Sequence, residues 1–445
     1  MFILLECPGE SSPESPFHLQ LWAAHVQTEM LTPGGLPEGR VACIVYGMKA
    51  RIITVSALVL LSCTDHKAPP DARGAGTPAA SSPQAPVSAP GIPQPHHGIE
   101  IIDAHVHIVP EMTALAQALE VLEKSGVTRF VAFSGGEVGS LRYAATVAMK
   151  RVLGERFHYL VNIDWDDFGA PGFVEETVFK LRQAADEGAR GLKIFKALGL
   201  KVRSKDGKLV AVDDPVLDPI FEECGKLGLV VAIHVADPAA FFKPVTPDNE
   251  RYDELSIASS WSFHGSDYPS FDELMAQQER RVARHPKTTF ILVHMGNNAE
   301  DLGYVASLLD KYPNVLVNTA ARVPEFGRHP AGEVRAFFIK YQDRIMFGSD
   351  FVSTPHGMQL GSVSKTEPTI PDGIIFFNRH WEYFETDHRQ MDHPTPIQGN
   401  WKVDAIHLPP EVLRKLYHDV AWNLFFAFQS HSRPGGSRWD GQTSN

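Results

Sequence analysis

From residue 99 onward, short runs of apolar and β-branched residues alternate with stretches in which apolar residues recur every three or four positions. The first pattern is typical of buried strands and the second of amphipathic helices, and their alternation indicates a parallel sheet with helical connections. Eight runs of the first kind occur, at 100–106, 128–133, 157–163, 190–195, 229–235, 288–294, 314–319 and 344–349. This number of units predicts an α/β fold of the (β/α)8 TIM-barrel type with long βα-loop insertions. A doubly wound open sheet is the alternative.

The long insertions are three of the predicted connections, at 196–214, 236–270 and 351–409. Each follows the C-terminal end of a predicted strand, where barrels build their binding and catalytic loops, so we expect lids and pocket walls rather than separate domains. The aromatic residues of the insertions are expected either to line a pocket or to pack the insertions onto the barrel; they are Phe241, Phe242, Trp261, Phe263, Phe376, Phe377, Trp381 and Tyr383.

The chain before residue 99 has a different pattern. Residues 48–63, MKARIITVSALVLLSC, combine a basic start, a short apolar stretch and a small residue before Cys63. This pattern predicts a lipoprotein-type signal peptide with Cys63 as the lipidated residue, and the alternative is an apolar segment followed by an unrelated cysteine. Because a signal peptide stands at the N-terminus, we interpret Met48 as the translation start and residues 1–47 as a misassigned extension.

Two further segments are predicted to be disordered. Residues 64–98 are rich in Pro, Ala, Ser and Gly and nearly lack large apolar side chains, which predicts an extended tether, and the polar residues 429–445 predict a disordered tail. The barrel domain is thereby predicted to cover residues 99–428. The protein is thus expected to be an exported bacterial lipoprotein that is anchored to the membrane and faces the periplasm or the cell surface, with membrane contact only through the lipid anchor.

Composition narrows the class of partner. Hydrophobic residues make up 43% and charged residues 21% of the chain, as in soluble globular proteins with a large core. The net charge of -12 and the absence of a long basic run argue against a nucleic-acid partner and favour a small-molecule substrate or a metal. Of the four cysteines only Cys224 lies in the predicted barrel, which excludes a disulfide within it.

Candidate metal ligands follow several of the predicted strands. DAHVH carries His105 and His107 on the first strand, the fifth and sixth strands end in His234 and His294, and Asp350 follows the eighth. Alternation along a strand places His105 and His107 on the same side. Imidazole nitrogens and a carboxylate suit zinc or a neighbouring divalent metal. Each residue alone has an ordinary structural explanation, such as a core histidine or a capping aspartate, and it is their combination that indicates a metal site.

The segments that carry these residues resemble the amidohydrolase superfamily, specifically the amidohydrolase-2 branch that includes aminocarboxymuconate-semialdehyde-type decarboxylases. The matching segments run from about residue 100 to 425 and are DAHVH, GLKIF, VDDPVLDPIFEECGKLGLVVAIHVADP, TTFILVHMGN and RIMFGSD. The resemblance implies one divalent metal, with zinc as the expected ion, held by four ligands, and a catalytic histidine at residue 294. The implied ligands are His105, His107, His234 and Asp350, and Asp103 is expected to orient the first strand.

Three other residues are candidates by position. In some superfamily members a lysine on the fourth strand is carbamylated and bridges two metals, whereas one metal is usual in this branch. We therefore expect Lys193 to bind a substrate carboxylate or orient a ligand, with a second-metal role as the alternative. Asn318 and Arg322 lie where a substrate anion would be bound, although Arg322 could equally pair with a neighbouring loop. The Asn-Ala pair usual in the family's last helix is replaced by Val420-Ala421.

The expected activity is metal-dependent hydrolysis of an amide, lactone or ester of a small molecule. Asp350 would accept a proton from the metal-activated water, and His294 would orient that water or polarise the carbonyl. Non-oxidative decarboxylation of a small unsaturated or aromatic acid at the same site is the first alternative. A surface lipoprotein that binds a ligand without turnover is the second, and the complete ligand set argues against it. We expect the protein to assemble as a dimer.

Overall fold

The structure is a computed structural model that describes residues 98–427. The described residues all fall within one compact unit. The predictions for the extension, the signal peptide with Cys63, residues 64–97 of the tether and the C-terminal tail lie outside the described residues. Within the described part, no helix is both long enough and apolar enough to span a bilayer.

The eight predicted strands are confirmed, and each pairs in parallel with the next along the chain. They are β1 (Ile101–Ile108), β2 (Val127–Ala132), β3 (Phe157–Val161), β4 (Gly191–Ile194), β5 (Val230–Ile233), β6 (Phe290–Leu292), β7 (Val315–Asn318) and β8 (Ile345–Met346).

Backbone hydrogen bonds join the last strand to the first. The Ala104 amide donates to the Phe347 carbonyl at 3.0 Å, and the Asp350 amide donates to the His105 carbonyl at 2.9 Å. Beyond this junction, β9 (Phe351–Thr354) pairs in parallel with β1, and β10 (Gly357–Leu360) folds back antiparallel on β9. The sheet therefore closes on itself, and the fold is the predicted (β/α)8 barrel rather than an open sheet.

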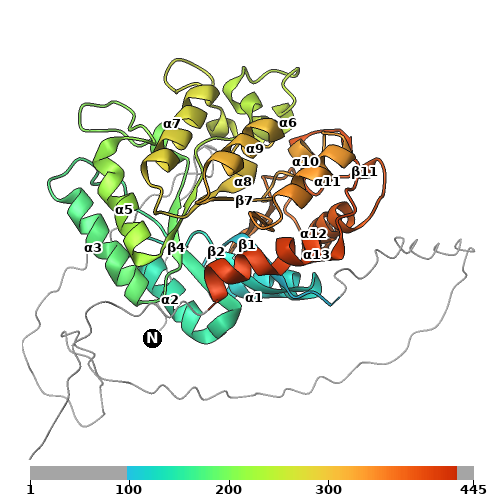
Figure 1. Ribbon diagram of the computed structural model, residues 1–445, viewed down its shortest axis with the longest axis horizontal. Helices are drawn as coiled ribbons and strands as arrows, with labels where there is room; N and C mark the ends of the chain where they lie inside the picture. Colours follow the sequence, from blue (N-terminus) through green and yellow to red (C-terminus); the bar gives the residue numbers. More distant parts are fainter. Residues whose placement is uncertain (1–97, 428–445) are drawn as a thin grey trace, which may run out of the picture. The chain divides into compact units, whose positions relative to one another are not determined.

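Helices cover the outside of the sheet (Figure 1). One main helix follows each of the first seven strands, namely α1 (Met112–Lys124), α2 (Leu141–Leu153), α3 (Phe173–Asp186), α5 (Asp218–Leu227), α7 (Phe271–Arg284), α9 (Leu302–Lys311) and α11 (Ala331–Lys340). The helices α12 (Ile370–Glu385) and α13 (Pro410–Arg414) follow the eighth strand. Shorter helices are α4 (Ala197–Leu200), α6 (Tyr252–Ile257), α8 (Val293–Gly296) and α10 (Val323–Phe326).

Local sequence signals define several helix ends. The Ser140 and Ser270 side chains accept hydrogen bonds from backbone amides in the first turns of α2 and α7. Thr369 and Asp372 form a capping box at the start of α12. Gly228 ends α5 in the left-handed conformation, as expected for a C-terminal glycine.

The core has two layers, because alternate strand residues face opposite sides of the sheet. Leu192 and Ile194 of β4 pack in the large cluster between sheet and helices, so Lys193 between them faces the barrel interior. The helical residues 415–426 at the end of the described chain also contribute to the interior cluster. They include the pair Val420-Ala421, which departs from the family pattern. The substituted pair therefore packs into the barrel interior, where apolar side chains are suited.

Candidate metal centre

Three of the predicted ligands converge at the C-terminal end of the barrel. The Nε2 atoms of His105 and His107 lie 3.2 Å apart, and Asp350 Oδ1 lies 3.4 Å from the first and 3.3 Å from the second. Among the His, Cys, Asp and Glu side chains of residues 98–427, the ligand atoms of these three lie close enough together to bind one ion. The ligand candidates of β1 and the one that follows β8 thus lie together in the structure, as the sequence predicted.

An irregularity in β1 turns its histidines inward. Ile102 and Ala104 pack in the interior cluster, whereas Val106 and Ile108 pack in the outer cluster. The inward side therefore changes from even to odd residues where the pairing with β2 shifts register, between Asp103 and Val106. A bulge of this kind re-aims side chains, and here it places His105 and His107 on the inward side.

Asp103 connects the two strands that carry the three ligands. Its Oδ1 accepts from the backbone amides of His105 at 3.0 Å and Ser349 at 3.1 Å, and its Oδ2 accepts from the Ser349 hydroxyl at 2.5 Å. Burial raises the pKa of Asp103 to about 7, although these three hydrogen bonds act in the opposite direction. The side chain binds the backbone of the ligand His105 and the residue before Asp350, Ser349, and does not itself join the ligand group.

Asp350 has an unusual backbone conformation and a lowered pKa. Its φ of 63° lies in the left-handed region, which costs free energy for a residue other than glycine. Burial raises its pKa, but a hydrogen bond from His107 and electrostatic interactions with His105, His107 and Lys193 outweigh burial and bring the pKa below its ordinary value. Burial, followed by the charge of Lys193, lowers the pKa of His105 well below its ordinary value. The group therefore offers a carboxylate and a neutral imidazole, which are the forms that bind metals.

The geometry of the group fits a zinc-sized ion. Ligands at 2.0–2.2 Å from a tetrahedral ion lie about 3.3 Å from one another, and the three separations here are 3.2, 3.3 and 3.4 Å. Two imidazole nitrogens and one carboxylate oxygen are a donor set that such ions prefer, and a three-ligand set keeps a position open.

His294 lies beyond the end of β6 and beside this group. Its ring centroid is 5.1 Å from that of His105, and its φ of 55° is left-handed. Its Nδ1 lies 2.9 Å from the Ala320 carbonyl oxygen, which can only accept, so the ring carries its proton on Nδ1. Nε2 is therefore the acceptor nitrogen. Burial, followed by the charges of His234, Arg322 and Lys193, lowers the pKa of His294 well below its ordinary value and keeps the ring neutral.

Asn318 is fully buried between two site histidines. Its Oδ1 accepts from the His294 backbone amide at 3.0 Å, and its Nδ2 lies 3.2 Å from His105 Nδ1. Both ends of the amide are thus in contact with protein groups, and Asn318 does not line the cavity beside the metal group. Its contacts are those of a residue that positions histidines rather than one that contacts substrate.

The fourth expected ligand, His234, does not join the three-residue group. Its Nε2 lies 3.3 Å from Asp237 Oδ1, and its ring centroid lies 4.3 Å from that of His294. Burial lowers its pKa to about 4 despite the nearby Asp237. His234 shares the cavity with the group, and its ligand role stays a prediction.

A cavity of about 240 Å³ adjoins the metal group. Two of the long insertions form much of its wall, as expected, through residues that include Phe241, Glu254 and Trp261 from one and Gln359 and Ser362 from the other. The aromatic residues 376, 377, 381 and 383 are instead buried in the packing of α12. The pocket-wall interpretation therefore holds for Phe241 and Trp261, and the packing interpretation holds for the α12 residues.

The cavity also contains cationic residues. Lys193 and Arg322 line it, as does Lys196, whose ammonium group is ion-paired with Asp237. Arg322 donates to the Ala321 carbonyl at 2.9 Å, and its Nη2 lies 3.6 Å from Asp237 Oδ1.

Several of these residues were not singled out from the sequence. Asp237 contacts His234, Lys196 and Arg322, and Glu254 binds Ser362 and Arg251. The position of Asp237, three residues after a strand-end histidine, was the available signal. Glu254 and Ser362 are 108 residues apart, and no local pattern connects them.

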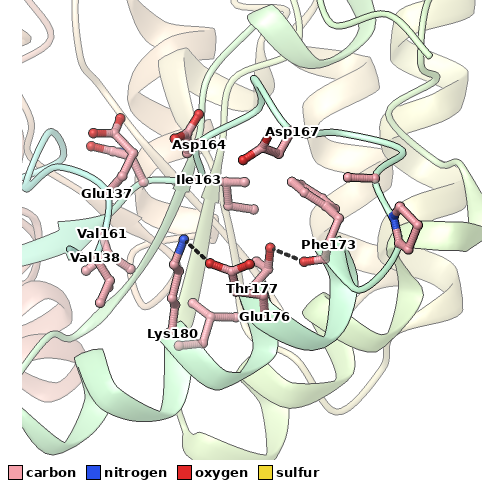
Figure 2. A pocket seen from close by; sticks show the side chains of 14 residues that line it. Glu137, Val138, Val161, Ile163, Asp164, Asp167, Phe173, Glu176, Thr177 and Lys180 are labelled. Atoms are coloured by element: carbon pink, nitrogen blue, oxygen red, sulfur yellow. Dashed lines mark hydrogen bonds and ion pairs between the residues drawn. The ribbon is translucent and has the colours of Figure 1, made fainter. Parts of the chain in front are cut away.

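A second cavity, of about 220 Å³, lies between the ends of β2 and β3 and the start of α3 (Figure 2). Glu137, Asp164, Asp167 and Glu176 line it, together with Lys180, which pairs with Glu176 at 2.8 Å. These carboxylates do not form a group with ligand spacing. This cavity is therefore not a second metal centre by the same criterion.

The sequence matches one protein-family model, described as Amidohydrolase, over residues 102–426. The match covers most of the chain and every candidate residue of the metal centre, and the chain belongs to the amidohydrolase family. Members of this family use divalent metals, in agreement with the His-His-Asp group. No curated protein matches the chain.

Solved structures with detectable similarity include a dihydroorotase from Campylobacter jejuni, with 12% identity, 75% of this chain and 85% of that chain covered, and a TM-score of 0.40. A D-hydantoinase (dihydropyrimidinase) from Thermus sp. has 15% identity, coverage of 62% and 64%, and a TM-score of 0.37. An Amidohydrolase 2 from Bifidobacterium longum subsp. infantis has 14% identity, coverage of 57% and 84%, and a TM-score of 0.32. These similarities are too low to inform the chemistry of the site.

Proposed function

We propose that the protein is a metal-dependent hydrolase that acts on an amide, lactone or ester of a small molecule. The observation that carries this proposal is the convergence of His105 Nε2, His107 Nε2 and Asp350 Oδ1 beside a cavity. Family membership supports metal-dependent amidohydrolase activity in general. The bond type and the substrate are the proposed part.

His105, His107 and Asp350 would hold the metal, and His234 would complete the site if its ring turned away from Asp237. A divalent metal here would supply a Lewis acid and lower the pKa of a water molecule toward neutrality. Zinc is the proposed ion because its preferred donors and distances agree with the group. Lys193 as a bridge to a second metal is the alternative proposal.

His294 would accept a proton through Nε2. The Ala320 carbonyl holds the ring proton on Nδ1, so Nε2 can orient a water molecule or receive its proton. The ring can polarise a substrate carbonyl by donation only after it has accepted that proton. Asp350 is ionised and can serve as the second acceptor, as the sequence suggested.

Asn318 and Asp103 would position these groups. Asn318 supplies the acceptor for the strained backbone amide of His294, and Asp103 fixes β1 against the segment before Asp350. Such contacts behind ligands typically change metal affinity or activity by 10–100-fold.

Decarboxylation of a small carboxylic acid is the second candidate function. It is favoured by the buried amino group of Lys193, which has no hydrogen-bond partner within residues 98–427. A panel of amides, lactones, esters and unsaturated or aromatic acids should be assayed in parallel for acid release and for CO₂ release with the zinc-loaded protein. Acid release without CO₂ supports hydrolysis, and CO₂ release without hydrolysis overturns it. Zinc binding without turnover of any compound would favour the ligand-binding alternative.

We also propose that the chain is exported and anchored through a lipid on Cys63, and that it forms a dimer. The support for export and lipid anchoring is the sequence pattern of residues 48–63. Mass spectrometry of the membrane fraction should find a lipidated N-terminal peptide beginning at Cys63. Peptides from residues 1–47 would contradict the proposed start at Met48.

A further inference from the structure

The cavity beside the metal group is lined by a glutamine whose side-chain oxygen has no hydrogen-bond partner. Gln398 is 2% exposed and belongs to the long insertion at 351–409. Its Oε1 is buried and accepts from no donor within residues 98–427. Buried polar atoms are normally paired, because an unpaired one has lost its hydration without a new partner. This oxygen is therefore suited to a donor that comes from outside the described chain.

The other end of the Gln398 amide is held by the backbone. Its Nε2 donates to the Gly361 carbonyl at 3.4 Å, and because a carbonyl oxygen can only accept, it is the nitrogen that faces Gly361. The backbone amide of Gln398 donates to the Thr395 carbonyl at 3.0 Å and closes the short helical turn Pro396–Gln398. Both the amide group and the turn that carries it are thus fixed, and Oε1 is the end that stays open.

The hydroxyl groups next to these contacts bind other acceptors. Ser362 follows Gly361 in the chain, and its hydroxyl donates to the Glu254 carboxylate. The Thr395 hydroxyl donates to the Leu360 carbonyl at 3.3 Å. Neither hydroxyl therefore supplies the missing partner of Oε1.

The position of Gln398 connects this oxygen with the metal group. Gln398, Gly361 and Ser362 line the same cavity as the metal-binding residues His107 and Asp350. A molecule that fills this cavity lies against both the metal group and the Gln398 side chain. A buried acceptor in a binding site favours ligands that donate to it, and it discriminates against ligands without a donor because the acceptor then stays unpaired.

We propose that Gln398 is a specificity-determining residue, whose Oε1 accepts a hydrogen bond from an N–H or O–H group of the substrate. It thereby selects molecules that carry such a donor over molecules of the same shape that lack it. This inference rests on the proposed function, because it takes the cavity beside the metal group as the substrate site. Gln398 lies in none of the sequence segments that carry the resemblance to the family, so its role follows from its contacts alone.

The test uses δ-valerolactam and cyclohexanone as probes. Both are rings of the same size with one carbonyl group, and the lactam has an N–H where the ketone has a methylene group. Their affinities for the zinc-loaded full chain are measured by calorimetry, and the zinc content of each sample is measured separately. Gln398→Met removes the acceptor, and Gln398→Glu keeps an acceptor oxygen. Gln342→Met is the matched control, because Gln342 also donates from Nε2 to a backbone carbonyl, that of Ile339, and does not line the cavity.

The measured quantity is the ratio of the lactam affinity to the ketone affinity. We expect this ratio to fall about tenfold in Gln398→Met, the effect of one hydrogen bond, with unchanged zinc content. Gln342→Met should keep the wild-type ratio, and Gln398→Glu should keep part of it. An unchanged ratio in Gln398→Met, an equal fall in Gln342→Met, or a wild type that does not bind the lactam would overturn the inference.

A purely structural role of Gln398 would give a different result. Since Oε1 has no partner within the described chain, Gln398→Met and Gln342→Met each lose one hydrogen bond to a backbone carbonyl and should unfold at similar denaturant concentrations. A much larger loss of stability in Gln398→Met, with an unchanged affinity ratio, would assign it to the fold and overturn the inference. A chain that binds no zinc but shows the Gln398-dependent ratio would contradict the proposed function and leave the Gln398 contact standing.

Discussion

His105 and Gly348 are in such close contact that a methyl group on Gly348 would lie 2.8 Å from the His105 Cβ. Real Cβ atoms do not approach each other this closely, so a larger residue at 348 must displace His105 or the strand that carries it. The metal centre therefore depends on a glycine that is not a ligand and that precedes Asp350 by two residues.

The first prediction concerns this contact. Gly348→Ala should weaken zinc binding by about tenfold or more, because the ligand histidine is moved. Gly332→Ala is the matched control, since an added Cβ there meets nothing within 4 Å, and it should leave zinc affinity unchanged. Competition titrations with a chelator measure both. Equal affinities in the two variants would show that His105 tolerates the displacement.

The second prediction concerns His294. Its replacement by alanine should lower kcat on the best substrate of the panel by about 10²–10⁴-fold, the usual contribution of a proton-transfer residue. Zinc content should not change, because His294 lies outside the three-residue ligand group. His356→Ala, at an exposed turn, serves as the control and should be fully active. Full activity of His294→Ala would refute the assigned role.

The third prediction concerns Asn318. Asn318→Ala removes the acceptor for the His294 backbone amide and should lower kcat roughly tenfold, since the ring is no longer held in place. Asn314, the residue before β7, is the matched control. Its side-chain amide donates to the carbonyls of His285 and Thr288. Asn314→Ala should therefore affect stability without changing kcat. A similar loss of kcat in both variants would indicate a general effect of loosening the strand.

The fourth prediction concerns pH and stability. Burial lowers the pKa of His380 to about 4, from an ordinary value of 6.5. Below pH 6.5 the histidine takes up a proton in the unfolded chain but not in the folded chain. The contribution of His380 to the free energy of unfolding is therefore fully present above pH 6.5 and is lost as the pH falls toward 4. When the pH falls from 7.5 to 5, His380 should lower the free energy of unfolding by about 2 kcal/mol.

Denaturant titrations at these two pH values measure the effect. His380→Phe should reduce the pH-dependent loss of unfolding free energy by about 2 kcal/mol, whatever its effect at pH 7.5. An unchanged difference between the two pH values would show that His380 is protonated in the folded protein.

The fold could be predicted from local patterns because each strand is a short apolar run and each helix has its own periodicity. The bounds of β4 and β7 followed directly from such runs, and DAHVH and FGSD indicated which strand ends carry ligands. The bulge in β1 could not be predicted, because it depends on pairing with β2 and on the contact between Asp103 and Ser349, which are 246 residues apart.

The same reason explains what was missed in the site. Asn318 was expected to contact substrate, because its position at the end of β7 gave no sign that His105 and His294 would occupy both ends of its amide. Among the described residues Lys193 has no hydrogen-bond partner, and this likewise depends on distant segments, because Asp237 and Glu254 are bound to other groups. Long-range contacts thus decide between roles that the local sequence leaves open.

The central claim is that His105, His107 and Asp350 form the metal centre. Its most direct test is the zinc stoichiometry and affinity of the full chain, compared with those of Asp350→Asn and His107→Gln. We predict about one zinc per wild-type chain and a large loss of affinity in both variants, with the fold retained by circular dichroism. A wild-type chain that binds no zinc, or variants that bind it as tightly as the wild type, would contradict the claim.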